Sequence, residues 1–258
     1  MIKLSAIVIA KNSEQLIEDC LKSLSFCDEI ILVDNGSNDE TVNIAKRYKA
    51  RIFRESNSDF SKLRNIGLSH AKSEWVLYID SDERVDDLLR ENIQAVIANP
   101  ALRSEAIFDI SAYRIKRKNF YLGNHQWPTI EKLERLFRRE NLEKWYGQLH
   151  ESPVVRGEIG ELDGFLIHLS HRDLSSMLDK TISWSKVEAQ LRLDAKHPTM
   201  TWWRFPRVMI TAFLNSYIKQ KGFKAGTAGL IESIYQSFSS FITYARVWEL
   251  QKENSEKS

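Results

Sequence analysis

Residues 75–83 read WVLYIDSDE, five apolar residues followed by three carboxylates with one serine between them. Such a run is typical of a strand that is buried on both faces and ends in a polar turn. Strand patterns precede it at 4–10 (LSAIVIA), 29–33 (EIILV) and, more weakly, 50–54; helical patterns lie between them at 13–24, 41–48 and 65–71, with Ser13 as the expected cap. This βαβαβαβ order predicts an α/β fold with a mostly parallel, doubly wound sheet and helices on both faces.

Composition excludes several classes of protein. The chain has 258 residues, with 43% hydrophobic and 28% charged, which is typical of a soluble globular protein. Lys plus Arg number 37 against 35 for Asp plus Glu, a net charge of +2, and a general nucleic-acid binder would carry a clear basic excess. Cys20 and Cys27 form no CxxC motif and no signal-peptide pattern opens the chain, so we expect reduced thiols and a cytoplasmic location.

Acidic side chains follow two of the expected strands. Asp34 ends the second, and Asp80 and Asp82 end the fourth. Ligands of such sheets bind beyond the carboxyl ends of the strands. No GxGxxG follows the first strand and the chain has no P-loop, so a dinucleotide or P-loop site is not expected. Carboxylates can hold a diphosphate through Mg²⁺ or Mn²⁺, which predicts a metal–diphosphate site; a solvated turn is the alternative.

Four ordered motifs resemble the family-2 glycosyltransferases, which have a GT-A fold: IVIAKN at 7–12, VDNGSNDET at 33–41, RNIGL at 64–68 and WVLYIDSDE at 75–83. The resemblance implies that Asp34 contacts the nucleotide of a nucleotide-sugar donor and that Asp80 and Asp82 organise the metal. It also implies donor-binding roles for Ala10, Asn12, Arg64, Asn65, Asp80 and Ser81. Asn35 and Glu40 replace an Asp and a Gly of the common motif, which leaves nucleobase selectivity open.

Later segments look like a narrower bacterial branch that adds glucose to the inner-core heptose of lipopolysaccharide: ERLFRR at 134–139, WYGQLHE at 145–151, and the tail segments 222–226 and 244–250. The predicted activity is inverting transfer of a hexose, glucose in the first place, from a UDP-sugar to a glycolipid, lipopolysaccharide-core or polysaccharide acceptor. Two alternatives stay open: a protein or peptide acceptor, and a catalytically inactive sugar-nucleotide-binding scaffold of envelope assembly.

An attacking hydroxyl needs a general base, and Glu151 is the candidate, with Glu131 and Glu134 as rivals. Asp82 is expected to act through the metal, which stabilises charge on the leaving diphosphate. The resemblance makes His168 a candidate third metal ligand; a structural histidine is the alternative.

Three residues are candidates for acceptor binding: Trp127 as a platform for a sugar ring, Arg135 for phosphate, and His150 beside the candidate base. Core packing is the competing interpretation of Trp127.

The tail differs from the rest of the chain. We expect a catalytic domain at 1–172 and a helical extension at 173–258, with breaks at 197–198 and 222–229. Residues 171–258 carry 13 basic and 8 acidic side chains, +5, and an apolar stripe runs from Ile231 to Trp248. Such helices suit peripheral contact with an anionic membrane. Packing against the catalytic domain or a second subunit explains the stripe equally well.

Overall fold

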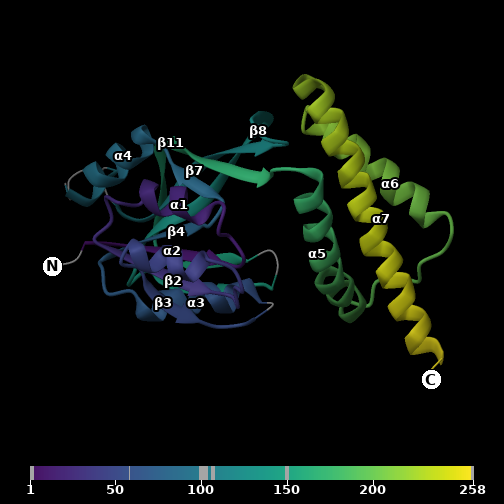
Figure 1. Ribbon diagram of the computed structural model, residues 1–258, viewed down its shortest axis with the longest axis horizontal. Coiled ribbons are helices and arrows are strands. Elements are labelled where there is room, and N and C mark those ends of the chain that lie inside the picture. Colours follow the sequence, from purple (N-terminus) through teal and green to yellow (C-terminus); the bar gives the residue numbers. More distant parts are fainter. Residues whose placement is uncertain (1–2, 58, 99–103, 106–107, 149–150, 257–258) are drawn as a thin grey trace. The chain divides into compact units, whose positions relative to one another are not determined.

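The computed structural model describes residues 3–57, 59–98, 104–105, 108–148 and 151–256 (Figure 1). Two compact units make up the chain. The first comprises residues 1–118 and 131–168, and the second comprises residues 119–130 and 169–258. The domain boundary expected at residue 172 stays a prediction.

Four parallel strands form one half of the main sheet in the order β3-β2-β1-β4: β1 (Leu4–Ala10), β2 (Glu29–Asp34), β3 (Arg51–Arg54) and β4 (Trp75–Asp80). The sheet continues with β8 (His125–Arg138), β7 (Phe108–Tyr121), β11 (Glu158–His171) and β5 (Glu83–Val85). β8 runs antiparallel to β4, and β5 antiparallel to β11. The short β6 (Ser104–Glu105) pairs with β7, and β9 (Leu142–Tyr146) pairs with β10 (Ser152–Val155) in a separate ribbon. The predicted α/β class and parallel strands are confirmed, within a sheet that is mixed.

Hydrophobic cores lie on both faces of this sheet because successive side chains of a strand point to opposite sides. Ala6 and Val8 of β1 pack with α1 (Ile17–Ser23), α2 (Thr41–Arg47) and α4 (Asp87–Ala98). Ile7 and Ile9 pack on the other face with α3 (Phe60–His70) and β9. Every residue of β1 is buried, as its unbroken apolar sequence predicts.

Two helix starts differ from the prediction. The expectation that Ser13 caps the first helix is wrong: α1 begins at Ile17, and its N-cap residue Leu16 makes no side-chain capping bond. The Ser13 hydroxyl instead lies 2.8 Å from that of Ser81. α3 begins at Phe60, because the carboxylate of Asp59 accepts from the backbone N–H of Lys62 and caps the helix there.

The second unit is helical, with α5 (Leu174–Asp194), α6 (Arg204–Leu214), a π-helical turn (Asn215–Lys219), a 3₁₀ turn (Gly222–Ala225) and α7 (Gly226–Glu256). α7 packs against both α5 and α6 (Figure 1). None of the described helices is long and apolar enough to cross a bilayer.

Small and polar side chains of α7 make these contacts. The Ser237 hydroxyl donates to the Met209 carbonyl on α6, and the Tyr235 hydroxyl donates to the Met177 carbonyl on α5. A Cβ on Gly229 would collide with the carbonyl oxygen of Gly222, so the backbones approach closely there. Several large apolar residues of α7 are exposed, among them Leu230, Ile234 and Trp248, whereas Val247 is fully buried in a small core with Ala189 and Met200.

Candidate functional site

The carboxyl ends of three parallel strands meet at one edge of the sheet. Register pairs Ala10, the last residue of β1, with Asp34 of β2, and pairs Ile9 with Asp80 of β4. β2 and β4 lie on opposite sides of β1, so the strand order reverses here, and open α/β sheets bind their ligands in the crevice expected at such a point. The predicted meeting of Asp34 and Asp80 at the end of β1 is therefore observed.

Hydrogen bonds join the loops that follow β1 and β2. The Asn12 N–H donates to the Ser37 hydroxyl (3.0 Å), and the Asn38 N–H donates to the Asn12 side-chain oxygen (2.9 Å). The Ser13 N–H donates to the hydroxyl of Thr41, at the start of α2 (2.7 Å). Asn12 has φ +47°, a left-handed conformation that asparagine tolerates better than most residues. One preformed wall of the crevice results.

Asp34 lies at the base of this wall and is fully buried. Its Oδ1 accepts from the Ser37 N–H at 3.1 Å. Its Oδ2 has no hydrogen-bond donor among the described residues, although Arg54 Nε lies 3.5 Å away. A buried carboxylate oxygen without a donor costs free energy. A ligand N–H or O–H would satisfy it, which suits the predicted contact with a nucleotide.

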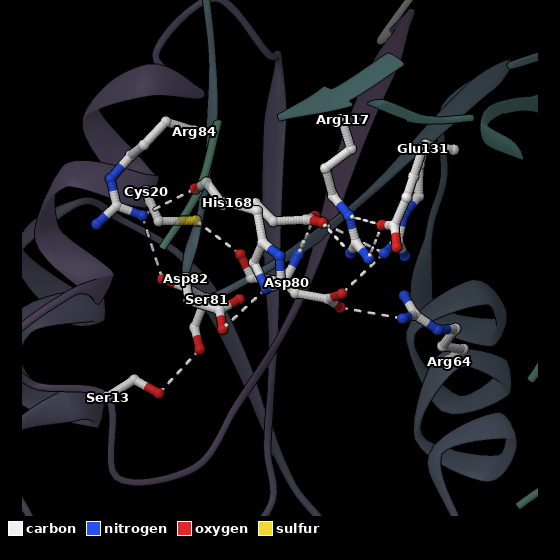
Figure 2. Close-up of polar contacts among 12 residues, drawn as sticks. Ser13, Cys20, Arg64, Asp80, Ser81, Asp82, Arg84, Arg117, Glu131 and His168 are labelled. Atoms are coloured by element: carbon white, nitrogen blue, oxygen red, sulfur yellow. Dashed lines mark hydrogen bonds and ion pairs between the residues drawn. The ribbon is translucent and has the colours of Figure 1, made fainter. Parts of the chain in front are cut away.

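Asp80 is held between two arginines, as Figure 2 shows for Arg64. Its Oδ1 lies 3.0 Å from Arg64 Nη2, and its Oδ2 lies 2.8 Å from Arg135 Nη2. Burial alone would raise the pKa of the Asp80 carboxyl, but the charges of Arg135, Arg64 and Arg117 hold that pKa well below its usual range. Asp80 is therefore ionised throughout the physiological pH range.

Glu83 extends this charge network beneath the site. Its fully buried carboxylate lies 2.9 Å from Arg117 Nη1 and 3.4 Å from Arg135 Nη2, and it accepts from the Asp80 N–H at 2.9 Å. Arg117 also pairs with Glu131 at 2.6 Å (Figure 2). The sequence patterns assign no role to Glu83 or Arg117. Glu83 stands in the DSDE stretch and could have been suspected; nothing in the sequence points to Arg117.

Asp82, in the turn between β4 and β5, and His168, on β11, come together. The β5–β11 pairing sets His168 opposite Glu83, and His168 Nε2 lies 3.3 Å from Asp82 Oδ2. Among the described residues, no three His, Cys, Asp or Glu side chains gather closely enough to hold an ion by themselves. Mg²⁺ is commonly bound by one or two carboxylates together with substrate phosphates, so this partial set of donors fits a divalent cation that arrives with a diphosphate. Asp80, the other predicted ligand, is occupied by its arginines.

Arg64 connects Asp80 to the candidate base. Its Nε and Nη2 lie 2.7 and 2.6 Å from Glu151 Oε1, while Nη2 also contacts Asp80. The guanidinium is buried, with its carbon 4.9 Å from the centre of the Trp145 ring. Asn65, one helical residue later, exchanges two hydrogen bonds with the Trp145 backbone, at 2.8 and 2.9 Å. Glu151, 69 positions beyond Asp82 in the sequence, is thus brought beside the metal motif.

The rival bases have other partners. Glu131 pairs with Arg117, and Glu134 pairs with Arg114 at 3.1 Å on an exposed part of the sheet. His150 lies outside the described residues.

Two of the acceptor candidates, Arg135 and Trp127, lie in the described residues, and both are buried. Arg135 is buried and its guanidinium is bound to Asp80, so it serves as a charge partner in this structure. Trp127 belongs to the second unit, where it is buried edge-to-face against Tyr121 and close to Gly222. The packing interpretation of Trp127 is the one observed, because a buried ring offers no face to a sugar.

Known proteins with similar sequences share one activity class. Residues 5–154, more than half of the chain, match the family model described as Glycosyl transferase family 2. The chain is 27% identical over 260 residues to lipopolysaccharide core biosynthesis glycosyltransferase LpsC of Rhizobium meliloti (strain 1021), covering 95% of this chain and 92% of that protein. It is 28% identical over 265 residues to an uncharacterized glycosyltransferase of Rickettsia typhi, covering 97% and 88%. Among solved structures, S. aureus TarS 1-349 has 17% identity and a TM-score of 0.45, covering 98% of this chain and 92% of that one.

Proposed function

The chain belongs to glycosyl transferase family 2, and we propose that it transfers a hexose, glucose in the first place, from a UDP-sugar to a lipopolysaccharide-core or related glycolipid acceptor at the cytoplasmic face of the membrane. The observation that carries the donor part of this proposal is the buried Asp34 oxygen without a hydrogen-bond donor at the end of β2. The acceptor part is supported by the relative LpsC, which is described as a lipopolysaccharide core biosynthesis enzyme.

Donor binding uses the crevice between the loops after β1, β2 and β4. Asp34 accepts a hydrogen bond from the nucleobase, and the diphosphate lies toward Asp82 and His168. A divalent cation bound there would be held by Asp82 and His168, with Asp80 as a further carboxylate nearby, and it would stabilise negative charge on the leaving diphosphate. The buried guanidiniums of Arg64 and Arg135 hold the Asp80 carboxylate in place.

Proton transfer is assigned to Glu151. Its carboxylate accepts the proton of the acceptor hydroxyl while that oxygen attacks the anomeric carbon from the side opposite the diphosphate, which inverts the configuration. Arg64 holds Glu151 by two nitrogens on one oxygen, Oε1, and so fixes its orientation. The acceptor hydroxyl would approach the other carboxylate oxygen, Oε2.

A thermal-shift series tests the donor site. UDP-glucose, UDP-galactose, UDP-N-acetylglucosamine and GDP-mannose are each added with Mn²⁺, with Mg²⁺ and with a chelator. We expect a metal-dependent rise in melting temperature with one UDP-sugar, because a ligand at 100 times its dissociation constant adds about 2.7 kcal/mol of stability. Asp34→Asn should weaken donor binding by about tenfold to a hundredfold, the range for a hydrogen bond to a charged group. Asp82→Asn should remove the metal dependence.

Absence of a shift with every nucleotide sugar, in a folded protein, would refute the donor assignment. A shift without turnover on any acceptor would favour the inactive scaffold.

Transfer assays then separate the bases and the acceptors. Glu151→Gln should bind the donor like the wild type and lose turnover by about a hundredfold or more. Glu131→Gln and Glu134→Gln serve as matched controls and should keep most of the activity. If one of them loses turnover while Glu151→Gln keeps it, the base is misassigned. Heptose-containing core saccharides and peptides are offered in parallel, and transfer to the peptides alone would overturn the proposed acceptor class.

A further inference from the structure

Large apolar side chains are exposed mainly on the second unit. The helix α6 has no buried residue at all. Trp202 is 81% exposed, and Ile210 and Ile218, which lie along one side of α6 and the π-helical turn, are 59% and 54% exposed. We call the following exposed residues the α6 patch: Trp202, Trp203, Ile210, Leu214, Ile218 and Phe223.

The way α7 packs explains why these side chains face outward. α6 contacts α7 partly through small side chains and backbone, as in the bond from the Ser237 hydroxyl to the Met209 carbonyl, and partly through Phe205, whose ring lies 5.8 Å from that of Phe241. The Ser216 and Ser233 hydroxyls lie 3.0 Å apart and are buried in the same region. In a helix of an ordinary soluble domain the apolar stripe faces the core. Here several of the contacts with α7 are polar or small, while Ile210, Leu214 and Ile218 are exposed.

Charge on this part of the chain has one sign. Residues 195–231 contain no Asp or Glu and six Lys or Arg, a net charge of +6, so the remainder of the chain carries −4. Five of the six basic residues lie in the same segment, 202–224, as the α6 patch: Arg204, Arg207, Lys219, Lys221 and Lys224. The guanidinium carbons of Arg204 and Arg207 lie 5.1 and 5.9 Å from the centre of the Trp203 ring. Aromatic, aliphatic and basic side chains are thus combined on α6 and the turns that precede and follow it.

We propose that the α6 patch docks on the surface of an anionic lipid bilayer, with α6 lying in the plane of the interface. Amphipathic helices of this composition bind membranes by burying Trp, Phe and Leu at the headgroup level while Lys and Arg contact anionic lipids. A second copy of the chain is a poor occupant, since two such faces would bring ten positive charges together, five from each copy. Binding of this kind needs no nucleotide sugar, so its test is independent of the proposed transfer reaction.

Vesicle flotation tests the electrostatic part. The full-length protein is mixed with vesicles of phosphatidylcholine alone, or of equal parts phosphatidylcholine and phosphatidylglycerol. We expect binding to the anionic vesicles only, reduced by high salt. Each basic residue near such a surface contributes about fivefold in affinity. Arg207→Gln, Lys219→Gln and Lys224→Gln combined should therefore weaken binding by about a hundredfold.

A charge-matched triple variant provides the control. Lys46→Gln, Arg47→Gln and Lys72→Gln change the net charge equally but lie in the first unit. Binding to anionic vesicles should be unchanged. Equal losses in both triple variants would show a general charge effect and overturn the patch.

The apolar part is tested by Ile210→Ser, Leu214→Ser and Ile218→Ser combined, which should abolish flotation. Leu174→Ser, Leu178→Ser and Ile182→Ser remove an exposed stripe of the same spacing from α5 and should have little effect. Circular dichroism confirms that both variants are folded. Flotation of the α6 variant at the wild-type level would refute the proposal. So would a wild-type dimer in sedimentation that the α6 substitutions dissociate, because the patch would then bind a second copy.

Discussion

Replacing Arg135 by methionine should lower the free energy of unfolding by about 3 kcal/mol, because the substitution leaves two carboxylates short of a partner. The Arg135 side chain is 6% exposed and lies 2.8 Å from Asp80 and 3.4 Å from Glu83. Breaking a buried ion pair from one side typically costs about 3–5 kcal/mol. Asp80 keeps Arg64 and Glu83 keeps Arg117, so the loss should lie at the lower end of that range.

Thermal unfolding followed by circular dichroism measures the effect. A loss of 1 kcal/mol lowers the melting temperature by about 2–4 °C in chains of 150–250 residues, so Arg135→Met should melt about 6–12 °C below the wild type. Arg114→Met is the matched control. Arg114 pairs with Glu134 at 3.1 Å but is 44% exposed, and exposed pairs contribute at most about 1 kcal/mol.

Equal small shifts in the two variants would refute the reasoning, since burial would then make no difference to the arginine. A double variant shows whether the loss of stability comes from the unpaired carboxylates. Arg135→Met leaves Glu83 with one arginine fewer, and adding Glu83→Gln removes that carboxylate charge. The two changes together should cost less than the sum of their separate effects.

Three further changes test other parts of the first unit. Gly67→Ala should lower stability by about 1–3 kcal/mol, since its Cβ would collide with Ile7 Cγ2; in thermal melts, Ile7→Ala should relieve part of that loss. Burial raises the pKa of the Cys20 thiol, so in a Cys27→Ser background Ellman's reagent should react with Cys20 only after denaturation; rapid reaction of the native protein would contradict this. Burial tends to raise the pKa of the Asp39 carboxyl, but the hydrogen bonds that it accepts lower that pKa overall, so the carboxylate stabilises the fold only while it is ionised. The stability that Asp39→Ala loses at neutral pH should therefore shrink as the pH falls below about 3.9, and urea titrations at several pH values measure this.

Sequence patterns predicted the parallel half of the sheet because three of its four strands, β1, β2 and β4, are mostly apolar runs bounded by polar turns. Asp34 and Asp80 stand at the ends of such runs, so the fold class alone places them at one edge. The antiparallel half was not predicted. β8 carries charged residues on both faces, as in the segment EKLERLFR at 131–138, and shows no clean alternation.

The charge network around Asp80 and Glu83 could not be predicted from the sequence, for a related reason. Arg117 and Arg135 lie on β7 and β8, and only their place in the sheet brings them to Asp80 and Glu83. The helices of the tail were predicted with their breaks, yet periodicity shows only that a helix has an apolar side. Whether that side is buried depends on which surfaces of the neighbouring helices pack against it. In α7, Gly229 and Ser233 are buried while Ile234 is exposed.

The hydrogen bonds between the loops after β1 and β2 affect the entropy and the rate of donor binding. The N–H groups of Asn12, Ser13 and Asn38 already donate to side chains, so they should exchange slowly with deuterium in the ligand-free protein. Ordering of these loops is part of folding and need not be repeated when a nucleotide arrives. Calorimetry of donor binding should accordingly show little of the unfavourable entropy that accompanies loop closure, and the association rate should approach that of a rigid, preformed pocket.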